Sequence, residues 1–303
     1  MSTHYLGIDM GGTASRWVLV DAAGHLTARG TAPGATGHLF NPASRGDFVS
    51  AIAILARAID AAPIAAAHIG ATGLGPRAHA DAAHILASAL VLDEQTVTLS
   101  DDMELAFRAA FAPGAGHLVS AGTGSVGLHV GADGSLVLVG GRGILIDDGG
   151  SGTWIALTAL DRLYRIIDET GGPGQAHHLA AHLFGAIGGD SWDDVRSFVY
   201  GADRGTIGGL ARAVASAADA GDRVAQEVLD RAGVELARLG LALVGRAGEK
   251  PIGYVGGLLD ISPRLKPALT TALDGHEVVF PTIDAALRAA QIARERALQL
   301  QDH

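Results

Sequence analysis

Short apolar segments separated by polar turns open this chain, a pattern typical of β-hairpins. Residues 1–30 contain three such segments, and the sequence DAAG at residues 21–24 predicts the turn before the third. A passage rich in Gly and Pro follows over residues 30–42, after which an Ala-rich pattern predicts a helix over 43–61. The chain is therefore expected to begin with a group of short strands and a long helix.

Strands and helices then alternate. The pattern predicts strands over residues 67–70 and 97–99 and helices over 78–90 and 103–111. Asp102 directly precedes the second of these helices, and its side chain is expected to cap the helix. Alternation of this kind indicates an α/β fold.

A second set of hairpin strands begins after residues 112–116. The turn at residues 132–134 takes the place that residues 22–24 take in the first set. The chain thus resembles one fold half used twice. We expect an N-terminal α/β lobe over residues 1–115 and a C-terminal α/β lobe over 116–303.

The C-terminal lobe is predicted to be mostly helical over residues 153–245, with breaks at 171–174 and 188–189. The elements predicted after it are a strand over 252–255, a helix that begins at Ser262-Pro263, a strand over 277–280 and a last helix over 283–300. The last helix is expected to pack back on the N-terminal lobe.

Composition narrows the classes of function. The 303 residues include 22 basic and 32 acidic side chains, a formal net charge of −10 that repels nucleic acid and anionic lipid. The absence of cysteine excludes disulfides, thiolate zinc sites and iron–sulfur clusters. No apolar run approaches the roughly 20 residues that span a bilayer. We therefore expect a soluble, cytoplasmic protein of two domains.

Two glycine-rich turns carry the strongest chemical signal. They lie at residues 7–13 (GIDMGGT) and 120–125 (SAGTGS), each between two apolar strands. Glycines at such turns bring backbone N–H groups and a hydroxyl close to an anionic oxygen, so two turns can hold one nucleotide from opposite sides. Asp9 within the first strand suits a magnesium ion held through water. Ordinary tight hairpins are the alternative for both turns.

Two adjacent carboxylates, Asp101 and Asp102, follow the strand at residues 97–99. A carboxylate at this position could orient an acceptor hydroxyl toward a phosphate and accept its proton. The sequence alone leaves either residue as the base, and helix capping is compatible with both roles.

Taken together, these motifs resemble the BadF/BadG/BcrA/BcrD-type ATPase family, whose sugar-kinase branch includes N-acetylglucosamine kinase and glucosamine kinase. The resemblance covers nearly the whole chain and includes five segments in order: residues 7–13, 100–102, 121–125, 141–152 and 256–257. It implies an actin-like ATPase (ribonuclease H-like) fold, with two α/β lobes around a nucleotide cleft. It also implies ATP and Mg²⁺ as cofactors, a small-molecule sugar acceptor and a homodimer.

The resemblance assigns roles to individual residues. It implies Asp102 as the catalytic base, with Asp101 as the alternative, and Asp9 near Mg²⁺. The phosphates of ATP would meet Gly11, Gly12, Thr13, Gly122, Thr123, Gly124 and Ser125, and adenosine would meet Gly256 and Gly257. The sugar would meet Thr36, Gly37, His38, Thr72, Gly73, Asp148 and Ser151.

The chain departs from the family pattern around Asp148. Relatives usually carry Trp where Arg142 stands, Gly where Asp147 stands and Glu where Gly149 stands. Relatives that bind N-acetylglucosamine often have Asn in place of Gly37, and Asn41 is a substitute that spacing does not require. These departures predict an altered acceptor pocket.

The predicted function is phosphorylation of a sugar hydroxyl, the 6-hydroxyl of N-acetylglucosamine, glucosamine or a related hexose derivative. The alternatives are an ATP-hydrolysing activator of the same family and a nucleotide-binding regulator that has lost catalysis. The lack of cysteine argues against the activators, because these hold an iron–sulfur cluster. His177, His178 and His182 are more typical of a solvated helix face than of a zinc site.

Overall fold

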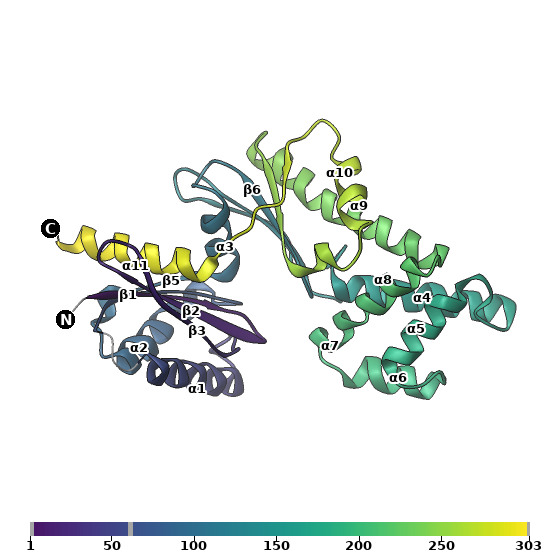
Figure 1. Cartoon of the computed structure of the whole chain (residues 1–303), viewed down its shortest axis with the longest axis horizontal. Helices are drawn as coiled ribbons and strands as arrows, with labels where there is room; N and C mark the ends of the chain where they lie inside the picture. Colours follow the sequence, from purple (N-terminus) through teal and green to yellow (C-terminus); the bar gives the residue numbers. More distant parts are fainter. Residues whose placement is uncertain (1–2, 60–62, 302–303) are drawn as a thin grey trace. The chain divides into compact units, whose positions relative to one another are not determined.

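The computed structural model describes residues 3–59 and 63–301 and divides the chain into two compact units (Figure 1). Unit 1 comprises Met1–Ala112 and Thr282–His303, and unit 2 comprises Pro113–Pro281. The chain thus returns to unit 1 with its last helix. The predicted end of the first long helix, at Ala61, lies outside the described residues.

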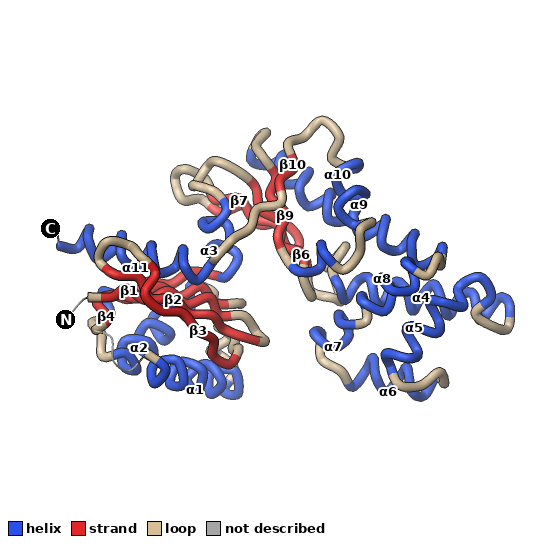
Figure 2. Tube along the Cα trace, viewed as in Figure 1, coloured by secondary structure: helices blue, strands red, loops and turns tan. Residues whose placement is uncertain are grey.

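Unit 1 is a five-stranded sheet with helices on both faces (Figures 1 and 2). Its strands are β1 (His4–Met10), β2 (Ala14–Asp21), β3 (Leu26–Pro33), β4 (Ile64–Ala71) and β5 (Val97–Asp101), and its α-helices are α1 (Pro42–Ala58), α2 (His79–Leu90), α3 (Asp102–Ala110) and α11 (Ala285–Gln301). The strand order is β3-β2-β1-β4-β5, in which β1, β4 and β5 run parallel and β2 and β3 run antiparallel to their neighbours.

Unit 2 repeats this topology and adds more helices. Its strands are β6 (His117–Ala121), β7 (Ser125–Val130), β8 (Leu136–Gly140), β9 (Ile252–Val255) and β10 (Val278–Val279), and its α-helices are α4 (Gly152–Thr170), α5 (His177–Ile187), α6 (Trp192–Gly201), α7 (Arg204–Gly209), α8 (Ala211–Asp219), α9 (Arg223–Ala247) and α10 (Leu265–Ala272). The order β8-β7-β6-β9-β10 places a meander beside two parallel strands, as in unit 1. The predicted duplication of an α/β half is confirmed.

Strand alternation decides which helices cover each face of the unit 1 sheet. In β1, Leu6 and Ile8 point to the core under α1 and α2, whereas Tyr5 and Gly7 face α11. Helix α11 presents small side chains to the sheet, among them Ala286, Ala290, Ala293 and Ala297. Because these residues recur at helical spacing, the helix backbone can lie directly against β1.

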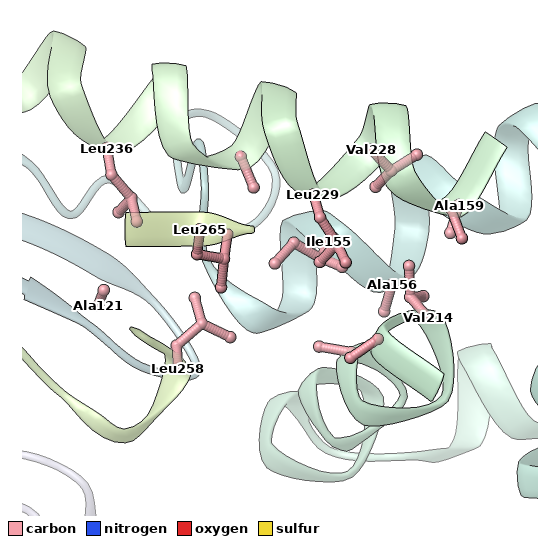
Figure 3. Packing of buried hydrophobic residues seen from close by; sticks show 14 of the residues in the cluster. Ala121, Ile155, Ala156, Ala159, Val214, Val228, Leu229, Leu236, Leu258 and Leu265 are labelled. Atoms are coloured by element: carbon pink, nitrogen blue, oxygen red, sulfur yellow. The ribbon is translucent and has the colours of Figure 1, made fainter. Parts of the chain in front are cut away.

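The core of unit 2 centres on α9, the longest helix described. Figure 3 shows Val228, Leu229 and Leu236 of α9 in the same apolar cluster as Ile155 of α4 and Leu265 of α10. All five side chains are fully buried. The packing fixes the start of α4 near the end of β6, where the second glycine-rich turn lies.

The structure corrects two predicted helix starts. Asp101, and not Asp102, caps α3: its backbone is extended (φ −67°, ψ 154°) and its carboxylate accepts from Met103 N at 2.9 Å, while Asp102 is already helical. Helix α10 begins at Leu265, beyond the predicted Ser262-Pro263 start. The Ser262 hydroxyl instead accepts from Arg264 N within a preceding turn.

The helical stretch over residues 153–245 is broken more often than predicted. Besides the breaks at 171–174 and 188–189, the chain turns at Ala202, near Leu210 and at 220–222. None of the helices in the described ranges combines the length and the apolar character that a membrane crossing requires.

The contact between β1 and α11 generates a first prediction. A Cβ atom at Gly7 would overlap the backbone of Ala286 and Ala290, so Gly7→Ala must push α11 away from the sheet. We expect a loss of about 1–3 kcal/mol in the free energy of unfolding, measured by urea denaturation. Gly46→Ala in α1 is the control, because no atom lies within 4 Å of the added Cβ. It should be neutral or stabilising, and equal losses in both variants would contradict the close packing.

Candidate functional site

The candidate residues of unit 1 gather at one edge of its sheet. Strands β1, β4 and β5 are parallel, so their carboxyl ends lie at the same edge. The residues that follow these ends are Gly11, Thr72 and Asp102. Ligands in open α/β sheets bind outside the carboxyl ends of the strands, which makes this edge the candidate site of unit 1.

The first glycine-rich turn joins β1 to β2 and leaves backbone donors free. Gly11 N donates to Ala14 O at 3.1 Å, and Gly11 O accepts from Ala35 N at 3.1 Å. The N–H groups of Gly12 and Thr13 have no hydrogen-bond partner among the described residues, and both residues are exposed. Two adjacent free donors form a concave site suited to an anionic oxygen.

The predicted sugar-contacting residues outside unit 2 lie beside this turn. Gly37 N donates to Thr72 O at 2.8 Å, which ties the loop after β3 to the end of β4. The His38 ring packs against Gly73, whose φ of +73° and lack of a side chain leave room for it. Thr36 approaches Gly12 in the same cluster.

Asn41, proposed above as a substitute sugar ligand, has a local task. Its side-chain oxygen accepts hydrogen bonds from Ala43 N and Ser44 N and caps α1. The side-chain oxygen of Asn41 therefore serves the helix cap, and its role toward a sugar stays a prediction.

Asp101 and Asp102 form a coupled carboxylate pair at the end of β5. Met103 N donates to Oδ1 of both residues at 2.9 Å, and the Thr72 hydroxyl donates to Asp102 Oδ2 at 2.6 Å. Burial, followed by the charge of Asp102 and a hydrogen bond between the two carboxyl groups, raises the pKa of Asp101 to about 7. Asp101 therefore changes its charge near neutral pH.

Asp9 adds a third carboxylate to the edge. It lies 3.6 Å from the exposed guanidinium of Arg16, and burial raises its pKa despite that neighbour. Within the described ranges, no group of three or more His, Cys, Asp or Glu side chains is arranged to hold a metal ion. The single carboxylate still fits Mg²⁺, because this ion commonly takes one protein carboxylate and completes its shell with water and phosphate oxygens.

The second glycine-rich turn has the same construction in unit 2. Gly122 N donates to Gly124 O at 2.9 Å, and the N–H groups of Thr123 and Gly124 are without partners among the residues that the structure describes. The start of α4 supports the turn, since Gly152 N donates to Gly122 O at 2.9 Å and the Thr153 hydroxyl donates to Thr123 O at 2.8 Å. The turn is thus tied to the start of α4, and two of its backbone donors are left without partners.

Gly256 and Gly257 lie next to this turn, after β9. Gly256 has a φ of +115°, and a Cβ there would overlap Ala121 O at the end of β6. Glycine is therefore required where β9 approaches the turn. Gly257 lines a cavity of about 360 Å³ whose other polar walls include Arg212, Ser216 and Asp219.

Three predicted contact residues of unit 2 are buried, and their side chains form hydrogen bonds within the protein. Ser151 is fully buried, and its hydroxyl accepts from Trp154 N to cap α4. The Ser125 hydroxyl donates to Gly149 O at 2.8 Å, within the protein. Asp148 is 4% exposed, and its carboxylate accepts from Ser125 N and pairs with Arg204. These side chains thus help to hold the turn in place.

Sequence reasoning missed two residues of this cluster. Arg204 of α7 lies against Gly124, and Glu235 of α9 places Oε2 2.8 Å from where a Cβ of Gly149 would be. Glu235 thus fills the space beside Gly149, where relatives carry Glu, and it pairs with Arg238, which also contacts Asp147. Both residues are far from the motifs in the sequence, and no local pattern marked them.

The chain was compared with known proteins. Residues 6–291 match the model of the BadF/BadG/BcrA/BcrD ATPase family, which confirms the resemblance. No curated protein sequence matches the chain.

Among solved structures, the chain is similar to a candidate N-acetylglucosamine kinase from Chromobacterium violaceum, with 23% identity and a TM-score of 0.72 over 96% of this chain and 98% of that chain. A candidate N-acetylglucosamine kinase from Porphyromonas gingivalis has 16% identity and a TM-score of 0.65 over 96% and 99% of the two chains. A ROK family glucokinase from Streptomyces griseus, solved in complex with glucose and AMPPNP, has 18% identity and a TM-score of 0.60 over 96% and 99%. The predicted actin-like ATPase fold is confirmed.

The carboxylate pair generates a prediction on pH-dependent stability. The pKa of Asp101 is about 7 in the folded chain and 3.8 in the absence of its neighbours, so the folded state retains a proton that the unfolded state loses. The stability from this group is full below about pH 4 and is lost as pH rises through 7. Asp101→Asn has no carboxyl group to titrate, and Asn is also a good N-cap residue. The Tm of this variant minus that of the unmutated protein should therefore be larger at pH 8 than at pH 5.

Asp203→Asn is the control for this prediction. Asp203 also caps a helix, but hydrogen bonds from Thr206 lower its pKa, so it is ionised at both pH values. Its effect on Tm should be the same at pH 5 and pH 8. A pH-independent effect of Asp101→Asn would contradict the raised pKa of Asp101.

Proposed function

Since this chain belongs to the BadF/BadG/BcrA/BcrD ATPase family, we propose that it is an ATP-dependent sugar kinase. It transfers the γ-phosphate of ATP to a sugar hydroxyl. The proposed acceptor is the 6-hydroxyl of N-acetylglucosamine, glucosamine or a related hexose derivative. The observation that carries the proposal is the Asp101–Asp102 pair beside Thr72 and the first glycine-rich turn. The likeness to a glucokinase solved with glucose and AMPPNP supports it.

In this proposal Asp102 is the catalytic base. The Thr72 hydroxyl and Met103 N hold its two oxygens, so the carboxylate has a fixed orientation. It accepts a hydrogen bond from the acceptor hydroxyl and takes its proton as the new O–P bond forms and the bond from the γ-phosphorus to ADP breaks. Asp101 is partly protonated near neutral pH, which reduces the negative charge beside Asp102.

The two turns supply donors for the polyphosphate. The free N–H groups of Gly12 and Thr13 in unit 1 and of Thr123 and Gly124 in unit 2 are proposed to bind phosphate oxygens. Asp9 would hold Mg²⁺ through water, and the ion would neutralise phosphate charge. Gly256, Gly257 and the adjoining cavity would receive adenosine.

The acceptor is assigned to unit 1. Thr36, Gly37, His38, Thr72 and Gly73 lie together at the edge that carries Asp102, and we propose that they contact the sugar. The sugar contacts predicted for Asp148 and Ser151 stay predictions, and both side chains are buried and hydrogen-bonded within unit 2. The amino-sugar preference, the homodimer and the cytoplasmic location stay predictions.

Release of ADP from ATP and Mg²⁺ tests the activity. We expect turnover that depends on the acceptor when N-acetylglucosamine, glucosamine and other hexoses are supplied one at a time. Hydrolysis that is independent of any sugar would favour the activator-type ATPase, and nucleotide binding without turnover would favour a regulator. Either result would contradict the kinase proposal.

Substitution of the base tests the mechanism. Asp102→Asn should lower kcat by about 10²–10⁴-fold, because the carboxylate that accepts the proton is lost, while the affinity for ATP stays within a few-fold. Isothermal titration measures the affinity separately from turnover. Asp101→Asn is the matched variant, which should keep turnover and change its pH dependence near 7. Loss of turnover in Asp101→Asn and retention in Asp102→Asn would exchange the two roles.

A further inference from the structure

One ion pair in unit 2 differs from the others. Arg204 Nη2 lies 2.5 Å from Asp148 Oδ2, with 49% of the arginine side chain exposed and 3% of the aspartate side chain exposed. In every other ion pair among the described residues, the acidic side chain is at least 22% exposed. A buried carboxylate holds an exposed guanidinium in a fixed position. An ion pair between two exposed side chains does not.

The guanidinium is held against the second glycine-rich turn. A Cβ atom at Gly124 would lie 2.6 Å from Arg204 Nη2 and 3.2 Å from Asp148 Oδ1. Glycine at this position therefore gives the ion pair its space. The other oxygen of Asp148 accepts from Ser125 N, so a single carboxylate positions both the turn and the arginine.

Hydrogen-bond donors remain available on this side of the turn. A guanidinium has five N–H donors, and within the described ranges the side chain of Arg204 bonds to Asp148 alone. The N–H groups of Thr123 and Gly124 are also free there. Planar guanidinium groups and adjacent backbone N–H groups both favour phosphate oxygens.

We propose that Arg204 binds the polyphosphate of a nucleoside di- or triphosphate and completes the anion site of the Gly122–Ser125 turn. Asp148 is the positioning residue that orients the guanidinium. This inference rests on the proposed function and adds the side chain that supplies positive charge to the nucleotide site. A purely structural role, in which Arg204 only neutralises buried Asp148, is the alternative.

Titration calorimetry with ATP, ADP and adenosine tests the proposal. Arg204→Met should weaken binding of ATP and ADP by about tenfold to a hundredfold and leave adenosine binding within twofold, because the lost hydrogen bonds are to phosphate. Arg204→Lys, which keeps the charge without the planar fork, should lose less. The KM for ATP should rise while the KM for the sugar stays constant. Arg264→Met is the control, since Arg264 pairs with Asp230, itself 45% exposed, away from the turn.

Two further variants distinguish a loss of phosphate contacts from a loss of stability. Arg204→Met leaves Asp148 buried without its cation, so the double variant with Asp148→Asn removes both charges and should show the same phosphate-dependent loss. Gly124→Ala keeps both charges and displaces the guanidinium, and it should also weaken ATP more than adenosine.

The outcomes separate this inference from the proposed function. If the unmutated protein binds ATP and the folded Arg204 variants bind it equally well, the role of Arg204 is overturned. The proposed function is then unaffected. Equal losses for ATP and adenosine, with a lower Tm, would assign Arg204 to structure and overturn it as well. An unmutated protein that binds no ATP would overturn both proposals.

Discussion

The direction of the strands is the constraint on which each candidate site depends. In both units, a strand that enters a glycine-rich turn lies parallel to the strand beside it, so segments distant in sequence end at one edge. In unit 1 the parallel pairing extends from β4 to β5, which brings Thr72 into contact with Asp102. In unit 2 it brings Gly256 against Ala121 O. Neither contact needs a helix to bend or a loop to reach across the sheet, because strand pairing alone supplies it.

Charge at the unit 1 edge follows from this crowding. Asp9 in β1 and Asp101 in β5 lie on the two strands that flank β4, and Asp102 begins α3. Burial raises the pKa of Asp9 and of Asp101, and the charge of Asp102 raises both further, while the guanidinium of Arg16 opposes the shift at Asp9. Because this site has excess negative charge, it favours the binding of a cation. It disfavours the binding of an anion that is not accompanied by a cation.

Local chemistry made the turns, the strands and the duplication predictable from sequence. The predicted turns form at Gly11, Gly12, Gly122 and Gly124, because turn geometry depends on the turn residues themselves. The roles of Asp148, Ser151 and Ser125 could not be read in the same way. Their partners come from α4, α7 and the loop before α4, and only packing determines that Arg204 reaches Asp148. The same limit applies to Ser262, whose capping signal yields to a turn before α10.

The space beside Gly149 restricts which residues can occur together at positions 149 and 235. Glu235 reaches from α9 into the volume that a larger residue at 149 would need. The loop and the helix can therefore each deliver a carboxylate to this place, but not both at once without displacement. Positions 149 and 235 should accordingly vary together among homologues, with glutamate at one accompanied by a smaller residue at the other.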